Sequence, residues 1–117
     1  MRTNTKEQEM EVILRKSEAA EPFTFRFLDG DKVIVKSENY KAKKSAENGV
    51  ESVRKNSQIE GRYELKEAKN GKFFFNLKAS NGQVVGTSAL FATEDERGDA
   101  IALLTSEAPD ATLTDEA

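Results

Sequence analysis

The chain has 117 residues, of which 33% are charged and 37% are hydrophobic, and its formal net charge is -3. It contains neither cysteine nor histidine, which excludes disulfides, thiolate nucleophiles, serine–histidine triads and every site that needs an imidazole. The length predicts one domain, or two small repeats that share a core, and the seven phenylalanines must fill much of that core.

The charge is distributed unevenly along the chain. Residues 94–117 hold eight acids against Arg97 alone, a local charge of -7, so the preceding residues sum to +4. We interpret the acidic end as a solvated C-terminal tail. The sequence has no apolar run long enough to span a bilayer, and residues 1–15 lack the apolar core of a signal peptide. We therefore expect a cytoplasmic protein that has no membrane partner.

The first elements are short and follow one another closely. Residues 1–9 are polar and aperiodic, which predicts a disordered preamble. The β-prone run at residues 10–15 predicts a strand. A hairpin follows, with strands near residues 23–28 and 32–36.

A change of period after the hairpin predicts a helix at residues 41–56. Gly49 interrupts it, and a glycine inside a helix costs about 1 kcal/mol relative to alanine, so we expect the helix to approach the sheet closely there. Small and branched apolar residues recur at helical spacing along one side. They are Ala42, Ala46, Val50 and Val53.

The second half of the chain repeats this order. A strand is predicted near residues 62–66, and residues 73–88 have the clearest hairpin pattern in the sequence. In its first strand, Phe73, Phe75 and Leu77 alternate with other residues, which predicts one dry face.

The register of the second hairpin depends on the length of its loop. A two-residue turn at residues 81–82 would place Leu77 opposite Gly86. A three-residue loop at residues 80–82, with the glycine in a bulge, instead places Val85 opposite Leu77. We prefer the second register because it gathers the apolar residues on one face.

The first hairpin has a turn that is one residue shorter. A two-residue loop at residues 29–30 would place Ile34 opposite Phe25, on the aromatic face. Ile34 then corresponds to Val85 of the second hairpin, which favours an internal duplication.

A second helix is predicted after the second hairpin. Thr93 and Glu96 have the spacing of a capping box, and Pro109 ends the helix. Residues 112–114 predict either a short terminal strand or a loose tail. The residues that we expect to face inward are Ala100, Ile101, Leu104 and Ala108.

Two motifs are specific enough to indicate a family. The first is Phe-x-Phe-x-Leu-Lys-Ala-x-Asn-Gly at residues 73–82, followed by Gly-Thr-Ser at residues 86–88. The second is the helical motif Gly-Val-x-Ser-Val-x-x-Asn at residues 49–56. Together they resemble the YegP-like family of small uncharacterised tandem-repeat proteins, and the resemblance covers about residues 10–107.

The resemblance implies an α+β fold of two β-β-β-α repeats that share one antiparallel sheet with the helices packed on it. One further strand would be exchanged between the repeats. We expect the first repeat at residues 10–60 and the second, with its acidic tail, at residues 61–117. The second helix departs from the family motif at residues 100–107, so a site formed by that motif is altered in one copy. The resemblance supplies no catalytic residues.

No residue pattern predicts catalysis, a cofactor site or a metal site. Ser37 and Ser88 hold corresponding places at the start of each strand-to-helix connection, but no recognised nucleophile motif surrounds them, and we expect structural hydrogen bonds instead. The acids at residues 94–99 lack the spacing of a calcium loop, so we assign them to helix capping.

These observations favour a monomeric, non-enzymatic binding or accessory module whose partner is unknown, with a protein as one candidate. The alternative is weak nucleic-acid binding through the basic first helix. The residues that would carry it are Lys41, Lys43, Lys44, Arg54 and Lys55.

Overall fold

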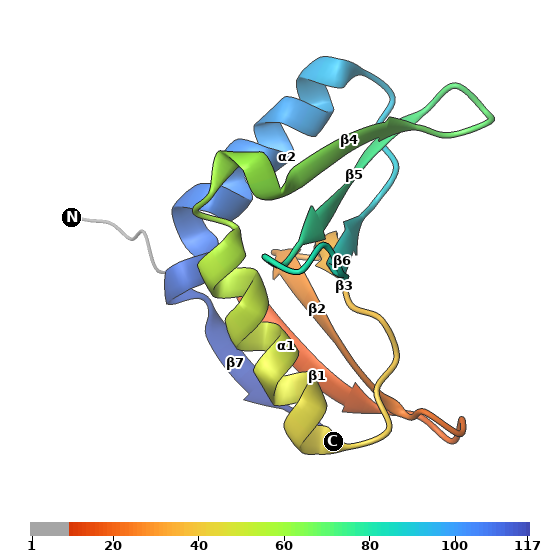
Figure 1. The fold of residues 1–117 in the computed structure, drawn as a ribbon, viewed down its shortest axis with the longest axis vertical. Coiled ribbons are helices and arrows are strands. Elements are labelled where there is room, and N and C mark those ends of the chain that lie inside the picture. The colour runs from red at the N-terminus through yellow and green to blue at the C-terminus, as the bar shows by residue number, and fades with distance from the viewer. Residues whose placement is uncertain (1–9) are drawn as a thin grey trace.

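The structure is a computed structural model that describes residues 10–117, so the preamble predicted at residues 1–9 lies outside the described residues. The elements follow the predicted order (Figure 1). They are β1 (Glu11–Lys16), β2 (Phe23–Asp29), β3 (Lys32–Lys36), α1 (Lys43–Asn56), β4 (Tyr63–Glu67), β5 (Phe73–Lys78), β6 (Val84–Ser88), α2 (Glu94–Glu107) and β7 (Thr112–Asp115), with short 3-10 turns at Glu60–Arg62 and Ala108–Asp110.

All the described strands belong to one seven-stranded sheet in the order β4-β5-β6-β3-β2-β1-β7. The first half of the chain (β1 to α1) and the second half (β4 to α2) meet where β3 pairs with β6. We predicted an antiparallel sheet throughout, and this is wrong at one edge, because β7 pairs with β1 in parallel. β1 and β7 lie at opposite ends of the described chain, so no tight hairpin turn joins them and the antiparallel direction is not imposed.

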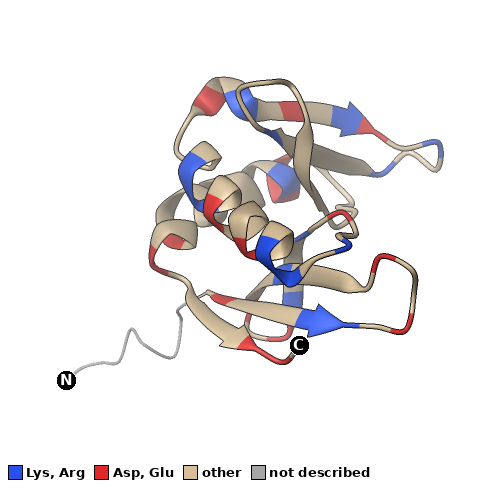
Figure 2. Cartoon of the chain, turned by 60° about the horizontal axis from the view of Figure 1, so that its bottom comes forward, with Lys and Arg blue, Asp and Glu red and all other residues tan. Residues whose placement is uncertain are grey.

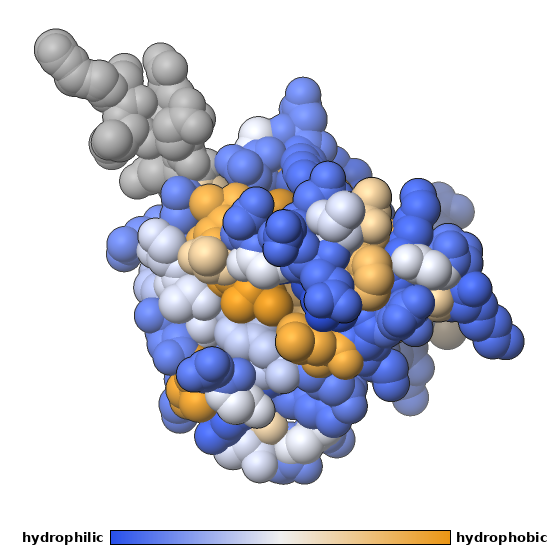
Figure 3. All heavy atoms as spheres, turned by 90° about the horizontal axis from the view of Figure 1, so that it is seen from above, coloured by the Kyte–Doolittle hydropathy of each residue, from blue (hydrophilic) through white to orange (hydrophobic). Residues whose placement is uncertain are grey.

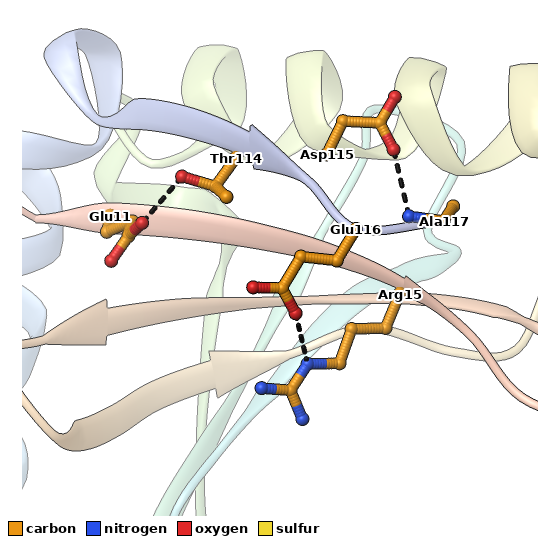
Figure 4. A network of polar contacts seen from close by, with 6 residues as sticks. All are labelled: Glu11, Arg15, Thr114, Asp115, Glu116 and Ala117. Atoms are coloured by element: carbon orange, nitrogen blue, oxygen red, sulfur yellow. Dashed lines mark hydrogen bonds and ion pairs between the residues drawn. The ribbon is translucent and has the colours of Figure 1, made fainter.

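Side chains as well as backbone hold β7 in place (Figure 4). Thr114 Oγ1 donates to the Glu11 carboxylate at 2.6 Å, and Arg15 pairs with Glu116 at 3.2 Å. Residues 112–115 therefore form a paired strand, which decides between the two alternatives that the sequence left open.

Both helices lie on the same side of the sheet (Figure 1), and the hydrophobic core fills the space between the helices and the sheet. The alternation in β2 and β5 buries the predicted aromatic face except at its first residues, Phe23 and Phe73, which are only partly buried. Helix α1 buries all of its predicted apolar stripe except Ala42, which is exposed because it precedes the first helical turn. The fully buried sheet residues include Phe25, Phe27, Phe75 and Leu77, and the helices add Ala46, Val50, Val53, Ala100 and Leu104.

Gly49 makes the close approach that the sequence predicted. A Cβ atom at this position would lie 2.6 Å from Tyr40 Oη and 2.9 Å from Phe25 Cε2. Real Cβ atoms do not come so close to neighbouring atoms, so any side chain here would push α1 away from the aromatic layer.

The second hairpin has the predicted three-residue loop, with Gly82 at φ +85. The register that we predicted beyond the loop is wrong. Leu77 faces Gly86, and Val85 is an extra residue in a bulge. Gly86 lies against a side chain of β3, where a larger residue would not fit. The bulge brings this glycine to the contact while Val85 stays buried.

The first hairpin contains a bulge at the corresponding place. Asp29 pairs with Lys32, so the two-residue turn is at residues 30–31 and the predicted loop at residues 29–30 is wrong. The register then shifts so that Phe27 faces Val35. The predicted pairing of Ile34 with Phe25 is therefore wrong, because Ile34 is the bulged residue. Ile34 nevertheless remains buried, so its correspondence with Val85 holds.

The start of α2 is capped as predicted. The Glu96 amide donates to Thr93 Oγ1 at 3.1 Å, and the Glu96 carboxylate accepts from the Ala92 amide at 3.0 Å. Of the residues predicted to face inward, Ile101 is only partly buried and the other three are buried. No helix in residues 10–117 is long and apolar enough to cross a bilayer.

Candidate functional site

Both of the serines considered as possible nucleophiles are used by the backbone. Ser37 Oγ accepts from the Phe25 amide at 2.9 Å and donates to a carbonyl at 2.7 Å. Ser88 Oγ makes the same two contacts, from the Phe75 amide at 2.9 Å and to a carbonyl at 2.7 Å. Each hydroxyl accepts a hydrogen bond from a strand amide at the point where the neighbouring strand ends. The predicted structural role of both serines is therefore confirmed.

The two family motifs meet in one groove of about 350 Å³, which we call the motif groove. The helical motif at residues 49–56 forms one wall, and the turn of the second hairpin forms the other. The lining residues are Asn48, Glu51, Ser52, Lys55, Asn56, Ile59, Arg62, Ala79 and Ser80.

A hydrogen-bonded network builds the floor of the motif groove. Asn56 is only 5% exposed, and its amide nitrogen donates to the Ser52 carbonyl at 2.8 Å and to Ser52 Oγ at 3.1 Å. Its amide oxygen accepts from the Arg62 guanidinium at 2.9 Å. A buried amide with all of these partners is rigid, so it fixes the position of the arginine at the groove.

The residues around the floor give the motif groove a mixed character. Ile59, at 38% exposure, presents an apolar side chain at the rim. Lys55 and Arg62 supply positive charge, while the Glu51 carboxylate pairs with Arg54 at 3.4 Å. Such a surface can bind a polypeptide or another polar ligand, and it does not combine a nucleophile with an activating base.

The end of α1 is attached firmly to α2 beside this groove. Tyr63 Oη donates to the Ser57 carbonyl at 2.9 Å and lies 3.2 Å from Thr105 Oγ1. Burial raises the pKa of Tyr63, so the phenol stays protonated and remains a donor. The groove therefore rests on a rigid junction of both helices.

A second groove occupies the corresponding place between α2 and the turn of the first hairpin, and we call it the acidic groove. Its volume is about 260 Å³. Asp99 stands where the motif groove has Asn48, and Leu103 stands where it has Ser52. The remaining lining residues are Asp29, Lys32, Ile34, Glu96 and Ala100.

The five basic residues predicted for nucleic-acid contact are divided between the two ends of α1 (Figure 2). At the N-terminal end, Lys41 and Lys44 are exposed, whereas Lys43 forms an ion pair with Asp115. This contact raises the pKa of Lys43 and lowers that of Asp115, mainly through their hydrogen bond.

At the other end of α1, Arg54 pairs with Glu51 and donates to the Pro109 carbonyl at 2.9 Å. Lys55 is exposed and lines the motif groove. Sequence reasoning missed Asn48, Ile59 and Arg62 as lining residues. Only their closeness to the helical motif could have pointed to them, because the groove forms when the distant hairpin turn packs against α1.

Comparisons with known proteins now identify the family. The model of a domain of unknown function, DUF1508, matches the chain twice, over residues 18–64 and 68–115. A UPF0339 protein of Pseudomonas aeruginosa is 52% identical over 84 residues, which cover 72% of this chain and 76% of that protein. The UPF0339 protein YegP of Escherichia coli K12 is 46% identical over 94 residues, covering 78% and 86%.

Solved structures agree with this assignment. The solution NMR structure of YegP from Escherichia coli has a TM-score of 0.84 at 42% identity, covering 92% of this chain and 93% of that one. That of a UPF0339 protein from Shewanella oneidensis also has a TM-score of 0.84, at 38% identity, covering 92% and 91%. The YegP-like resemblance of the sequence is confirmed, and the chain belongs to the UPF0339 family of DUF1508 proteins, whose function is unknown.

Proposed function

We propose that this protein is a non-catalytic binding module that holds a protein partner in the motif groove. The observation that carries the proposal is that the two most specific sequence motifs, which lie far apart in the chain, line the same groove. The corresponding acidic groove has lost both the motif and its polar floor. We infer that one chain offers one such site.

The chemistry of the groove supports binding rather than catalysis. Ser52 Oγ accepts from Asn56, and Glu51 is paired with Arg54, so neither is free to activate the other. The hydroxyls of Ser37 and Ser88 are likewise engaged with the backbone.

The exposed apolar side chain of Ile59 supports a protein partner in particular. Protein interfaces combine a small apolar centre with polar surroundings. Ile59 would supply the apolar centre here, with Lys55 and Ser80 as part of its polar surroundings. Figure 3 shows the surface from above, where apolar side chains occur as separate patches among hydrophilic ones. Ile59 lines the motif groove, whereas Leu90, which is also exposed, lies outside that groove.

We further infer that the two halves are β-β-β-α repeats and that the chain acts as a monomer. The matching serine contacts and the matching bulges at Ile34 and Val85 support the duplication. Pairing of β3 with β6 joins the two halves within one chain, so a second copy is not needed to complete the sheet.

The test is capture of partners from lysate by the immobilised protein, before and after nuclease treatment. Ile59→Lys should abolish capture of a specific protein, because it places a charge in the apolar part of the groove. Leu90→Lys is the matched control, since Leu90 is 51% exposed but lies outside the groove. Circular dichroism should show that both variants are folded.

Two results would contradict the proposal. One is an unchanged set of captured proteins with Ile59→Lys. The other is capture that disappears after nuclease treatment, which would instead favour nucleic-acid binding through the exposed Lys41, Lys44 and Lys55.

A further inference from the structure

The sheet has an outer face, opposite the helices, and a row of polar residues crosses its centre. The strand register sets the row: Arg26 lies opposite Lys36, Lys36 opposite Thr87, Thr87 opposite Asn76, and Asn76 opposite Glu64. The alternation of each strand turns these side chains away from the buried residues beside them. The first two residues belong to the first half, and the last three belong to the second half.

In the second half, the row is a closed network. Thr87 Oγ1 donates to Asn76 Oδ1 at 2.9 Å, and Asn76 Nδ2 donates to the Glu64 carboxylate at 3.1 Å. Lys78 Nζ lies 3.1 Å from the other oxygen of that carboxylate. These contacts, from Asn76 first and then Lys78, lower the pKa of Glu64. Every charge in this part of the row has a partner.

In the first half, the row brings two cations together. Arg26 and Lys36 stand where the second half has Asn76 and Thr87, and both are exposed. Within residues 10–117, neither forms an ion pair. Directly opposite residues have Cβ atoms about 4.5 to 5.5 Å apart, and like charges at that spacing destabilise a sheet. The fold therefore keeps an arrangement that its own stability does not favour.

A cavity of about 540 Å³ lies over these two cations, and it is larger than either groove beside the helices. Its lining includes the hydroxyl residues Thr24, Ser37 and Thr87. The remaining lining residues are Glu21, Phe25, Arg26, Lys36, Glu38 and Asn39.

The charges in this cavity are separated along the strands. Glu38 follows Lys36 by two positions, and Glu21 comes before the start of β2, so both acids lie beyond the cations toward that end of the strand. One end of the cavity is thus cationic and the other acidic. An anionic group is attracted to the first end and repelled from the second.

We propose that this cavity binds an oxyanion, the phosphate group of a small molecule or of a nucleic-acid strand, between Arg26 and Lys36. The planar guanidinium can hold two phosphate oxygens, and the ammonium adds a point charge. The hydroxyl of Thr24, which also lines the cavity, can donate to a remaining oxygen. The site shares no lining residue with the motif groove, so each proposal stands or fails alone.

The test is an NMR titration of the ¹⁵N-labelled chain with inorganic phosphate and, separately, with a short single-stranded oligonucleotide. We expect saturable shifts in the amides of β2, β3 and β6 around the cavity. The double variant Arg26→Gln, Lys36→Gln should bind at least about tenfold more weakly, because each cation contributes a charge-assisted hydrogen bond. Binding of phosphate alone would indicate a small ligand, and much tighter binding of the oligonucleotide would indicate a polymer.

A matched control separates this site from general charge effects. Lys69→Gln, Lys72→Gln changes the net charge equally, and both of these lysines are exposed outside the cavity. This control should bind as the unmodified chain does. The melting temperature of the Arg26, Lys36 variant should be unchanged or higher, since the opposed charges are gone.

Three outcomes would overturn the proposal. They are equal weakening in the two double variants, shifts that do not saturate, and shifts confined to the basic residues of α1. A loss of stability in the Arg26, Lys36 variant would also contradict it, because the two cations would then be structural.

Discussion

In the first half of the molecule, Ser37 Oγ accepts a hydrogen bond from the Phe25 amide at 2.9 Å. In the second half, Ser88 Oγ accepts one from the Phe75 amide at the same distance. The isolated bridges that follow also match, because Phe23 pairs with Tyr40 as Phe73 pairs with Phe91. Contacts that fix where each third strand leaves the sheet are therefore the same in both halves.

The surfaces of the two halves differ at corresponding positions. Lys36 on the outer face is replaced by Thr87, and Asn48 in the motif groove is replaced by Asp99. The comparison teaches that one set of positions holds the backbone and another set supplies binding chemistry. The second set can change in one half without disturbing the first.

The largest expected effect tests the shared interior. Phe25→Ala and Phe75→Ala should each lower the free energy of unfolding by about 3 to 5 kcal/mol, because both rings are fully buried and their loss leaves a cavity. Phe25 packs on Tyr40 with ring centroids 6.3 Å apart, and Phe75 packs on Tyr63 at 5.4 Å. Chemical denaturation measures both changes.

Phe23→Ala serves as the control for this pair, since Phe23 is only partly buried and should cost less. The correspondence of the halves would be broken if one buried phenylalanine cost less than about 1 kcal/mol while the other cost the full amount.

A smaller effect tests a difference inside the shared interior. The first half pairs Gly49 with Tyr40, and the second half has Ala100 and Phe91 at these positions. The hydroxyl of Tyr40 occupies the space that a Cβ at residue 49 would need. Gly49→Ala should therefore lower the free energy of unfolding by about 1 to 3 kcal/mol through overpacking. The higher helix propensity of alanine should offset about 1 kcal/mol of this loss.

Removing the hydroxyl should relieve part of this cost. In a Tyr40→Phe background, Gly49→Ala should be less destabilising than in the unmodified chain, although Phe25 Cε2 would still lie 2.9 Å from the new Cβ. A double-mutant cycle measures the coupling between the two sites. Additive effects would mean that the nearby Phe25 ring, and not the hydroxyl, excludes the side chain.

The sequence predicted those parts of the fold that depend on neighbouring residues. The strand expected at residues 32–36 has those bounds, and Thr93 caps α2 as its spacing required. The predictions from the sequence were wrong where distant strands meet. The bulge at Ile34 depends on packing between β3 and β6, and the direction of β7 depends on where α2 returns the chain.

The candidate sites were predictable only in part. The motifs that line the motif groove were visible in the sequence, but their meeting was not. The two cations of the outer face were hidden by a register error, since a two-residue loop at residues 29–30 would pair Arg26 with Val33. The observed turn and bulge instead bring Arg26 opposite Lys36. The basic residues predicted as one group lie at the two ends of α1, and Asp115, far along the chain, pairs with Lys43.

The smallest effect concerns the starts of the two helices. Thr93 caps α2, and three acids occupy its first turn, whereas Ala42 gives α1 no side-chain cap, and α1 has no acid there. Thr93→Ala should lower the free energy of unfolding by about 1 kcal/mol, and Ala42→Ser should raise it by about 0.5 to 1 kcal/mol, since a serine oxygen can accept an amide at the end of the helix. Thermal and chemical denaturation measure both changes.

Two controls show whether the oxygen acts as a cap. Thr93→Ser keeps the acceptor and should be near neutral, and Ala42→Val adds bulk without an acceptor and should give no gain. Ala42 is exposed and its backbone is extended, at φ -119 and ψ 143, as an N-cap residue requires. If Ala42→Ser gives no gain although Thr93→Ala is costly, the start of α1 is limited by the cations in its first turn and not by the missing cap.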